Sequence, residues 1–156
     1  MADKRLTPEG ILTELLSRYA GTTSVEAWGE TSVFYNPGLA LPRGVYFATV
    51  KEKDGENDRA SELGRDGVFR LNVGLPKPEF VKRFGPAPAR PPKGGVVEGP
   101  WTFTALDQTM PHPVYGWMGW ICVLNPTQQT FDALTPLIDV AYAKARASFE
   151  KRLSKS

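Results

Sequence analysis

The spacing of apolar residues changes twice along this chain, from helical to strand-like and back, and this order restricts the folds that it can adopt. Thr7 and Pro8 form a typical helix start, and the apolar stripe behind them has helical spacing and ends before Gly21. Thr130 is the expected N-cap of a second helix. The apolar stripe of this second helix consists of Leu134, Ile138, Ala141, Ala145 and Phe149. We therefore expect one helix near each end of the chain.

The region between these helices has the composition and spacing of strands. Strands are predicted over residues 31–35, 45–51, 68–74 and 117–124, with 101–106 as a further candidate. Segments rich in Gly, Pro and charged residues separate them, as expected of successive antiparallel strands. The sequence therefore predicts a single α+β domain over residues 1–156, in which N-terminal and C-terminal helices pack on one face of an antiparallel sheet.

The predicted strand at 68–74 has a different chemistry on each face. Leu71 and Val73 alternate with Arg70 and Asn72, and successive side chains of a strand point to opposite faces of the sheet. One face is therefore expected in the core, while the other presents a cation and an amide.

Length, composition and charge are those of an ordinary soluble protein. A chain of 156 residues fits one domain. Its single Cys cannot form an intramolecular disulfide, its N-terminus lacks the pattern of a signal peptide, and no apolar run approaches the roughly 20 residues of a membrane-spanning helix. We expect a cytoplasmic protein without membrane association.

The common catalytic signatures do not occur in this sequence. There is no phosphate-binding Gly loop followed by Lys-Ser/Thr, no His-Glu-x-x-His, no Gly-x-Ser-x-Gly and no Cys-x-x-Cys. No residue is therefore assigned a catalytic or metal-binding role, no cofactor is expected, and a non-enzymatic function is favoured.

The distinctive polar and aromatic residues fall into three segments that could form one ligand site. The loop at 52–66 is longer than a hairpin requires, and long loops often hold binding residues. The polar face of the strand at 68–74 adjoins it. The segment 110–125 contains the only His and the only Cys. The candidate binding residues are Asn57, Asp58, Arg59, Ser61, Arg70, Asn72, His112, Trp117 and Trp120.

Structural roles also account for the rarer of these residues. A lone His is usually satisfied by local hydrogen bonds, and His112 as a general base would need a carboxylate, for which Asp107 is the nearest candidate in sequence. Cys122 lies in an apolar strand and is expected to be a small buried hydrophobic residue. Trp117 and Trp120 fit core packing as well as a pocket wall.

Several segments also resemble known families. LPRGVYFATV, NDRASEL, GVFRLNVGL and HPVYGWMGWICVLNP together resemble an uncharacterised bacterial family, known only as a domain of unknown function, which implies no activity. More remotely, the last third is similar to the MmcQ/YjbR group, whose tryptophan-containing strand precedes a long helix. That resemblance implies a frataxin-like sandwich and suggests DNA binding. The chain departs from the group's pattern at Ala141, where the group usually has Ser.

Three functional hypotheses follow. The first is a non-catalytic binding domain for a small polar or anionic ligand. The second is a DNA-binding protein that uses Arg83, Arg90, Lys93 and the basic C-terminal helix. The third is a small hydrolase or isomerase that uses His112 with Asp107.

Overall fold

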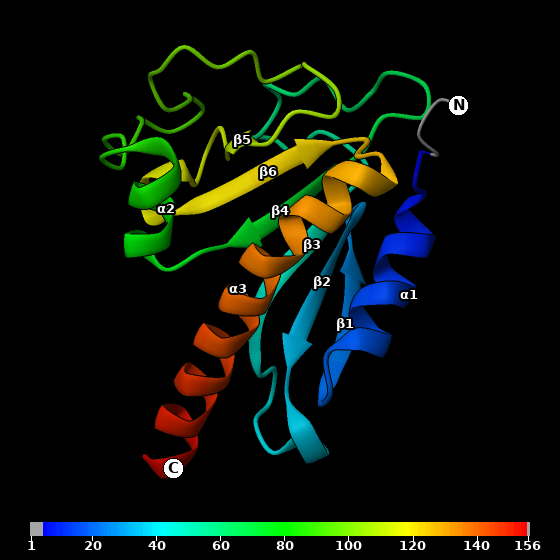
Figure 1. Ribbon diagram of the computed structural model, residues 1–156, viewed down its shortest axis with the longest axis vertical. Coiled ribbons are helices and arrows are strands. Elements are labelled where there is room, and N and C mark those ends of the chain that lie inside the picture. Colours follow the sequence, from blue (N-terminus) through cyan, green and yellow to red (C-terminus); the bar gives the residue numbers. More distant parts are fainter. Residues whose placement is uncertain (1–4, 156) are drawn as a thin grey trace.

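Antiparallel strands form the centre of the molecule. Within residues 5–155, which the computed structural model describes, six strands form one sheet in the order β1-β2-β3-β4-β6-β5 (Figure 1). Every neighbouring pair is antiparallel. The strands are β1 (Thr22–Ala27), β2 (Glu30–Tyr35), β3 (Val45–Lys51), β4 (Arg70–Gly74), β5 (Met110–Pro111) and β6 (Trp120–Leu124).

Two helices from opposite ends of the chain cover one face of this sheet. They are α1 (Pro8–Arg18) and α3 (Gln128–Ser154), and Figure 1 shows both on the same side. A shorter helix, α2 (Lys77–Phe84), follows β4 and closes at Gly85. The predicted α+β fold, with N-terminal and C-terminal helices on one face of an antiparallel sheet, is therefore confirmed. None of the helices in the described part of the chain combines the length and hydropathy that crossing a membrane requires.

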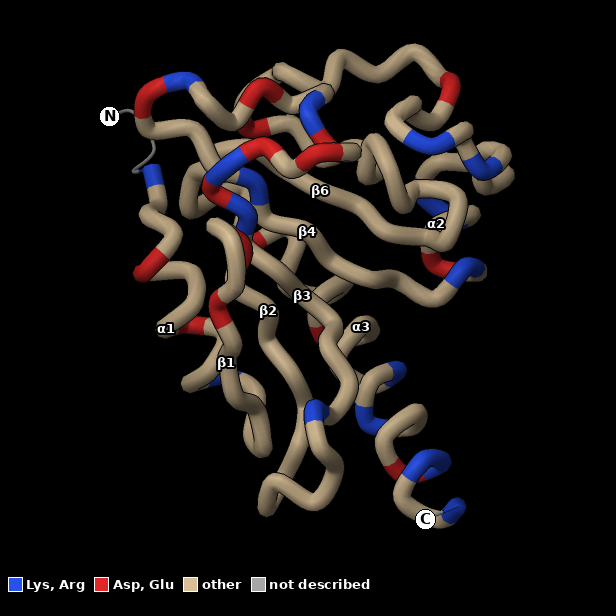
Figure 2. The backbone as a smooth tube through the Cα atoms, turned by 180° about the vertical axis from the view of Figure 1, so that it is seen from behind, with Lys and Arg blue, Asp and Glu red and all other residues tan. Residues whose placement is uncertain are grey.

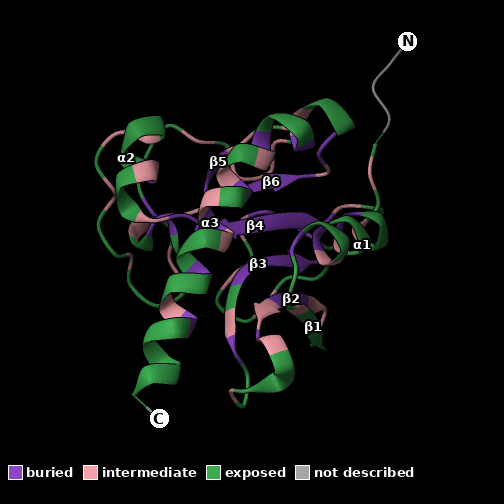
Figure 3. Ribbon diagram, turned by 60° about the horizontal axis from the view of Figure 1, so that its bottom comes forward, coloured by how far each residue is buried: buried purple, intermediate pink, exposed green. Residues whose placement is uncertain are grey.

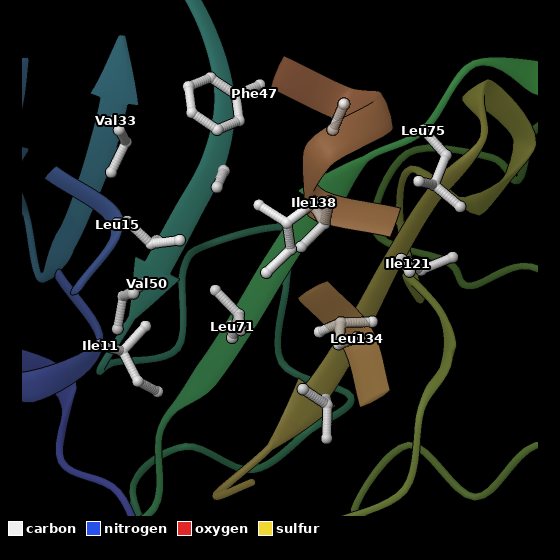
Figure 4. Packing of buried hydrophobic residues seen from close by; sticks show 14 of the residues in the cluster. Ile11, Leu15, Val33, Phe47, Val50, Leu71, Leu75, Ile121, Leu134 and Ile138 are labelled. Carbon is white, nitrogen blue, oxygen red and sulfur yellow. The ribbon is translucent and has the colours of Figure 1, made fainter. Parts of the chain in front are cut away.

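The main core lies between the two helices and the inner face of the sheet (Figure 4). Ile11 and Leu15 of α1 pack against the strands at one end, and Leu134 and Ile138 of α3 pack at the other. Leu71 of β4 lies among them and is fully buried. This matches the apolar stripes in the sequence, because residues at helical spacing share one face of a helix.

The N-terminal boundary of α3 differs from the expected one. Thr127 caps the helix, three residues before the predicted Thr130, and its Oγ1 accepts a hydrogen bond from the Thr130 N–H at 3.3 Å. The carboxylate of Asp107, distant in sequence, accepts a 2.8 Å bond from the Thr127 N–H. The helix therefore begins at a residue whose own N–H is held by a long-range contact and whose hydroxyl satisfies one of the first backbone donors of the helix.

Several strand predictions also need correction. β1 was not predicted, residues 101–106 form no strand, and the first part of 117–124 is a 3₁₀ turn (Gly116–Met118). β1 pairs with β2 through a tight turn at Trp28 and Gly29, which both have positive φ. β5 is a two-residue edge strand that includes Pro111, and an edge position tolerates a residue without an N–H.

The outer face of β4 is covered although it is polar. All five residues of β4 are buried (Figure 3). Arg70 and Asn72 face away from the helices, toward the loop between β3 and β4 and the segment around His112. Beside them, a second apolar cluster of Leu63, Met110, Cys122 and Leu124 fills the outer face of β6. β4 is thus buried on both faces, with an apolar side and a polar side.

Candidate functional site

A pocket of about 620 Å³ opens on the face of the sheet opposite the helices. Its size falls in the range of roughly 300–1,000 Å³ that is typical of small-molecule sites. Strands, the loop between β3 and β4 and the segment after β5 all contribute to its wall. The lining residues are Trp28, Glu30, Ser32, Tyr46, Thr49, Lys51, Glu56, Asn57, Asp58, Asn72, His112, Val114, Tyr115 and Trp120.

A fully buried arginine supports this pocket from below. Arg70 Nη1 donates a 3.0 Å hydrogen bond to Asp58 Oδ1, and Nη2 donates to the other carboxylate oxygen. Nη1 also donates to Ser61 Oγ at 2.9 Å, and Nε donates to Asn72 Oδ1 at 2.7 Å. Asn72 in turn donates to Thr49 Oγ1 at 2.9 Å. The guanidinium therefore fixes the loop to the sheet, and two-point pairing with a carboxylate is the strongest form of such a contact.

The charge of Arg70 also determines the state of Asp58. Burial of Asp58 acts to raise its pKa, but the hydrogen bonds and positive charge of Arg70 outweigh burial and lower the pKa below its ordinary value. The carboxylate is therefore ionised at neutral pH and its charge is paired inside the protein.

His112 is held in its neutral form. Nδ1 accepts hydrogen bonds from the backbone N–H groups of Val114 at 3.0 Å and Tyr115 at 3.1 Å. Nε2 lies 3.1 Å from Arg70 Nη2, which can only donate, and 4.0 Å from Asp58 Oδ2. Both ring nitrogens therefore face N–H donors, which disfavours a ring that carries a proton on each nitrogen. Burial and the nearby Arg70 charge lower the pKa of His112 well below 6.5. Both nitrogens lie against N–H donors in a buried site, so the ring shapes the pocket and is poorly suited to act as a general base.

This state of His112 predicts a specific dependence of stability on pH. Below about pH 6.5 the unfolded chain binds a proton on its histidine while the folded protein does not, so the free energy of unfolding falls as pH falls, with a slope that approaches about 1.4 kcal/mol per pH unit. The sequence contains one His. Because the unfolded histidine is only half protonated at about pH 6.5, urea unfolding of the wild type should show a loss of about 1 kcal/mol between pH 6.5 and 5.5, and the variant His112→Gln should lack this loss. If the free energy of unfolding depended on pH equally in both proteins, His112 would not be held neutral in the folded state.

The ammonium group of Lys51 is also paired at the edge of the pocket. Lys51 Nζ lies 3.5 Å from Glu30 Oε1, and its side chain is 10% exposed. These two residues stand opposite each other in the register of β3 and β2. The charges of Lys51 and Asp58 therefore both have partners within the protein.

Aromatic rings form the other wall of the pocket. The rings of Tyr46 and Trp120 are 5.4 Å apart, and Tyr46 is half exposed. Gly74 lies opposite Trp120 in the register of β4 and β6, and a Cβ at Gly74 would lie 2.7 Å from the indole ring. The absence of a side chain at Gly74 therefore lets the indole lie directly against the β4 backbone.

The variant Gly74→Ala should displace this indole. An added methyl group at such a contact typically costs about 1–3 kcal/mol of stability and shifts the neighbouring ring. We expect a lower free energy of unfolding and an altered tryptophan fluorescence spectrum. Gly64→Ala is the matched control, because a Cβ at Gly64 meets nothing within 4 Å and its φ is not positive. Equal effects in the two variants would show that Trp120 does not depend on Gly74.

The structure brings together most, but not all, of the predicted binding residues. Asn57, Asp58, Asn72, His112 and Trp120 line the pocket. Arg70 and Ser61 lie beneath its surface and are buried. The other two lie elsewhere: Arg59 is exposed outside the lining, and Trp117 contacts the guanidinium of Arg90, whose Cζ is 4.8 Å from the ring centroid. Those two predictions are not supported by the geometry.

The sequence interpretation missed the contribution of β2 and β3. Tyr46, Thr49 and Lys51 face the pocket, while Phe47 and Ala48 both lie in the core. The register between β2 and β3 shifts at this point. Such an irregularity interrupts the alternation of faces, which is why this strand shows little alternation in sequence. The polar Thr49 and Lys51 at a spacing of two were the available signal.

The residues considered for catalysis do not form a catalytic group. Asp107 is bound to the N-terminus of α3, and the carboxylate beside His112 is Asp58. The pairing of His112 with Asp107 is therefore wrong. Burial raises the pKa of Cys122 to about 12, so this thiol is a poor nucleophile at neutral pH. Within residues 5–155 no group of three or more His, Cys, Asp or Glu side chains could hold a metal ion.

Comparison with known proteins places the chain in a family but gives no activity. A family model described as a family of unknown function, DUF6194, matches residues 6–154. The searches of curated proteins and of solved structures found no match. Any functional conclusion therefore depends on the geometry of the pocket.

Proposed function

The chain belongs to DUF6194, a family of unknown function, and from the geometry of its pocket we propose that it binds a small, uncharged ring compound bearing several hydroxyl groups, such as a sugar or a nucleoside. The observation that carries this proposal is the pairing of charges around the pocket. Asp58 is neutralised by Arg70, and Lys51 is neutralised by Glu30. An ionic ligand would have to compete with these internal partners, and the remaining charged residue of the lining, Glu56, is exposed.

The remaining groups of the pocket suit a neutral polar ligand. Ser32, Thr49 and Asn57 offer hydroxyl and amide groups that both donate and accept hydrogen bonds. Tyr46 and Trp120 present aromatic surface beside them. Aromatic rings combined with a few fixed polar groups give a pocket both apolar contact and orientation. This favours the polar ligand over the anionic one, since Glu30, Glu56 and Asp58 would repel an anion.

Isothermal titration calorimetry with a panel of neutral monosaccharides and nucleosides tests this proposal. We expect a ligand whose affinity falls about tenfold, or about 1.4 kcal/mol, in the variants Asn57→Ala and Tyr46→Ala. The matched controls are Arg59→Ala in the same loop and Trp117→Leu in the aromatic segment. Neither residue lines the pocket, so both variants should bind as tightly as the wild type.

Two results would overturn the proposal. One is the absence of binding to every neutral compound at millimolar concentration. The other is a ligand whose affinity is unchanged in the Asn57 and Tyr46 variants. Thermal denaturation of each variant without ligand establishes that it is folded, so a loss of binding is not confused with a loss of structure.

A further inference from the structure

A second pocket, of about 460 Å³, lies where β3 and β4 separate. The two strands are paired only from Ala48 to Lys51 of β3 and from Arg70 to Val73 of β4, and Val45 and Gly74, which lie beyond this pairing, both line the pocket. Figure 1 shows the long helix α3 passing in front of β3 and β4, and residues of α3 from Ala141 to Arg152 line the pocket. Tyr46 and Trp120 line both pockets. The second pocket is therefore a neighbour of the first, but its chemistry is different.

Positive charge dominates the lining of this second pocket. Arg43, Lys144 and Arg152 contribute to it, and within the described part of the chain its lining has no Asp or Glu. Lys144, Ser148 and Arg152 occur four residues apart, which places them on one side of α3 in successive turns. Figure 2 shows Lys and Arg gathered along the C-terminal turns of this helix.

These cations have no acidic partner in the described part of the chain. Among residues 5–155, no ion pair involves Arg43, Lys144 or Arg152. Lys144 Nζ lies 3.5 Å from the Leu75 carbonyl oxygen, and Arg152 Nη1 donates to the Gly44 carbonyl oxygen at 3.3 Å. Burial lowers the pKa of Lys144. Lys144 as a residue is nevertheless exposed. An ammonium group whose contact among the described residues is a single carbonyl oxygen would gain from an anion beside it.

The dipole of α3 does not explain the whole arrangement. Cations in the last turn of a helix interact favourably with its C-terminal end, which accounts for Lys151 and Arg152. That effect decays within one turn, and Lys144 lies ten positions before the end of α3 at Ser154. Its place beside Arg152 and Ser148 therefore requires another reason.

We propose that the second pocket binds an oxyanion of the phosphate type carried by a small molecule, with Lys144, Arg152 and Arg43 as charged contacts and the Ser148 hydroxyl as a hydrogen-bond donor. Arginine and lysine recognise phosphate through charge-assisted hydrogen bonds. Tyr46 and Trp120 also line this pocket, and their rings offer an apolar surface for the organic part of such a molecule.

Titration with simple anions at constant ionic strength tests the site. Pyrophosphate and ribose 5-phosphate should bind the wild-type protein and its Asn57→Ala variant equally, with ribose and sodium chloride as comparison solutes. Any ribose that binds in the first pocket is recognised because Asn57→Ala weakens it. Each of Lys144→Gln and Arg152→Gln should weaken binding about tenfold. Arg146→Gln and Lys151→Gln are matched controls on the same helix, because neither residue lines the pocket. They should leave the affinity unchanged.

Comparison of the ligands shows whether the site recognises a phosphorylated organic molecule, an inorganic anion or nucleic acid. Tighter binding of ribose 5-phosphate than of pyrophosphate identifies a phosphorylated organic ligand and supports the proposal. Tighter binding of pyrophosphate, equal weakening in all four helix variants, or no binding would overturn it. Binding of duplex DNA that is weakened in all four variants would assign the charge to nucleic acid instead. Asn57→Ala, in the first pocket, should have no effect on pyrophosphate, so this test is independent of the neutral-ligand proposal.

Discussion

Replacing Arg70 with methionine is expected to lower the free energy of unfolding by about 3–5 kcal/mol, the range found when one partner of a buried ion pair is removed. Methionine has a comparable length but supplies no donors. The variant leaves the mostly buried carboxylate of Asp58 without its cation and leaves Ser61 and Asn72 each without one hydrogen bond. Urea unfolding monitored by tryptophan fluorescence measures the loss.

Two further variants identify the cause of this loss of stability. Arg59→Ala removes an exposed cation from the same loop and should change stability by less than about 0.5 kcal/mol. The double variant Arg70→Met with Asp58→Asn should be more stable than the sum of the two single changes predicts, because it removes both charges together. Additive costs would mean that Arg70 and Asp58 do not stabilise each other.

The second large effect on stability is expected for Leu71, which lies on the opposite face of β4 from Arg70. Leu71 is fully buried in the main core and stands opposite Val50 and Val123 in the register of the sheet. Leu71→Ala should cost about 2–5 kcal/mol, which combines the lost transfer free energy with the cavity left behind. Urea unfolding again measures the difference.

An exposed valine provides the comparison for Leu71. Val25 in the edge strand β1 is 56% exposed, and Val25→Ala should change stability by less than about 1 kcal/mol. A cost below about 1 kcal/mol for Leu71→Ala would contradict the packing of β4 against α3. Large costs at both Arg70 and Leu71 would show that adjacent residues of one strand stabilise the fold by different means.

The local sequence predicted the helices, because the residues that anchor them in the core recur at regular helical spacing. The apolar stripes of α1 and α3 predicted both helices, since each stripe forms one face of the core. The tight turn at Trp28 and Gly29 escaped prediction because a tryptophan with positive φ is unusual. The start of α3 was misplaced because Asp107, far away in sequence, contributes to it.

The site could be predicted only in part, for a related reason. Asp58, Asn72 and His112 were recognisable as unusual polar residues, and the fold brings them together. Sequence patterns could not show that Arg70 is buried or that Asp58 is its partner, because the contact joins a loop to a strand. Tyr46 and Lys51 were missed because the irregular register of β3 changes which residues face the pocket.

The tryptophan indoles offer the most direct test of the proposal that the first pocket binds a neutral polyhydroxyl compound. The chain has four Trp residues; Trp28 and Trp120 line the pocket, whereas Trp101 and Trp117 do not. Their indole N–H signals can be followed by NMR during titration with the neutral panel and assigned with single Trp→Phe variants. The proposal predicts that the Trp28 and Trp120 signals shift with ligand while those of Trp101 and Trp117 stay in place. Shifts confined to Trp101 and Trp117, or no shift at any indole, would contradict it.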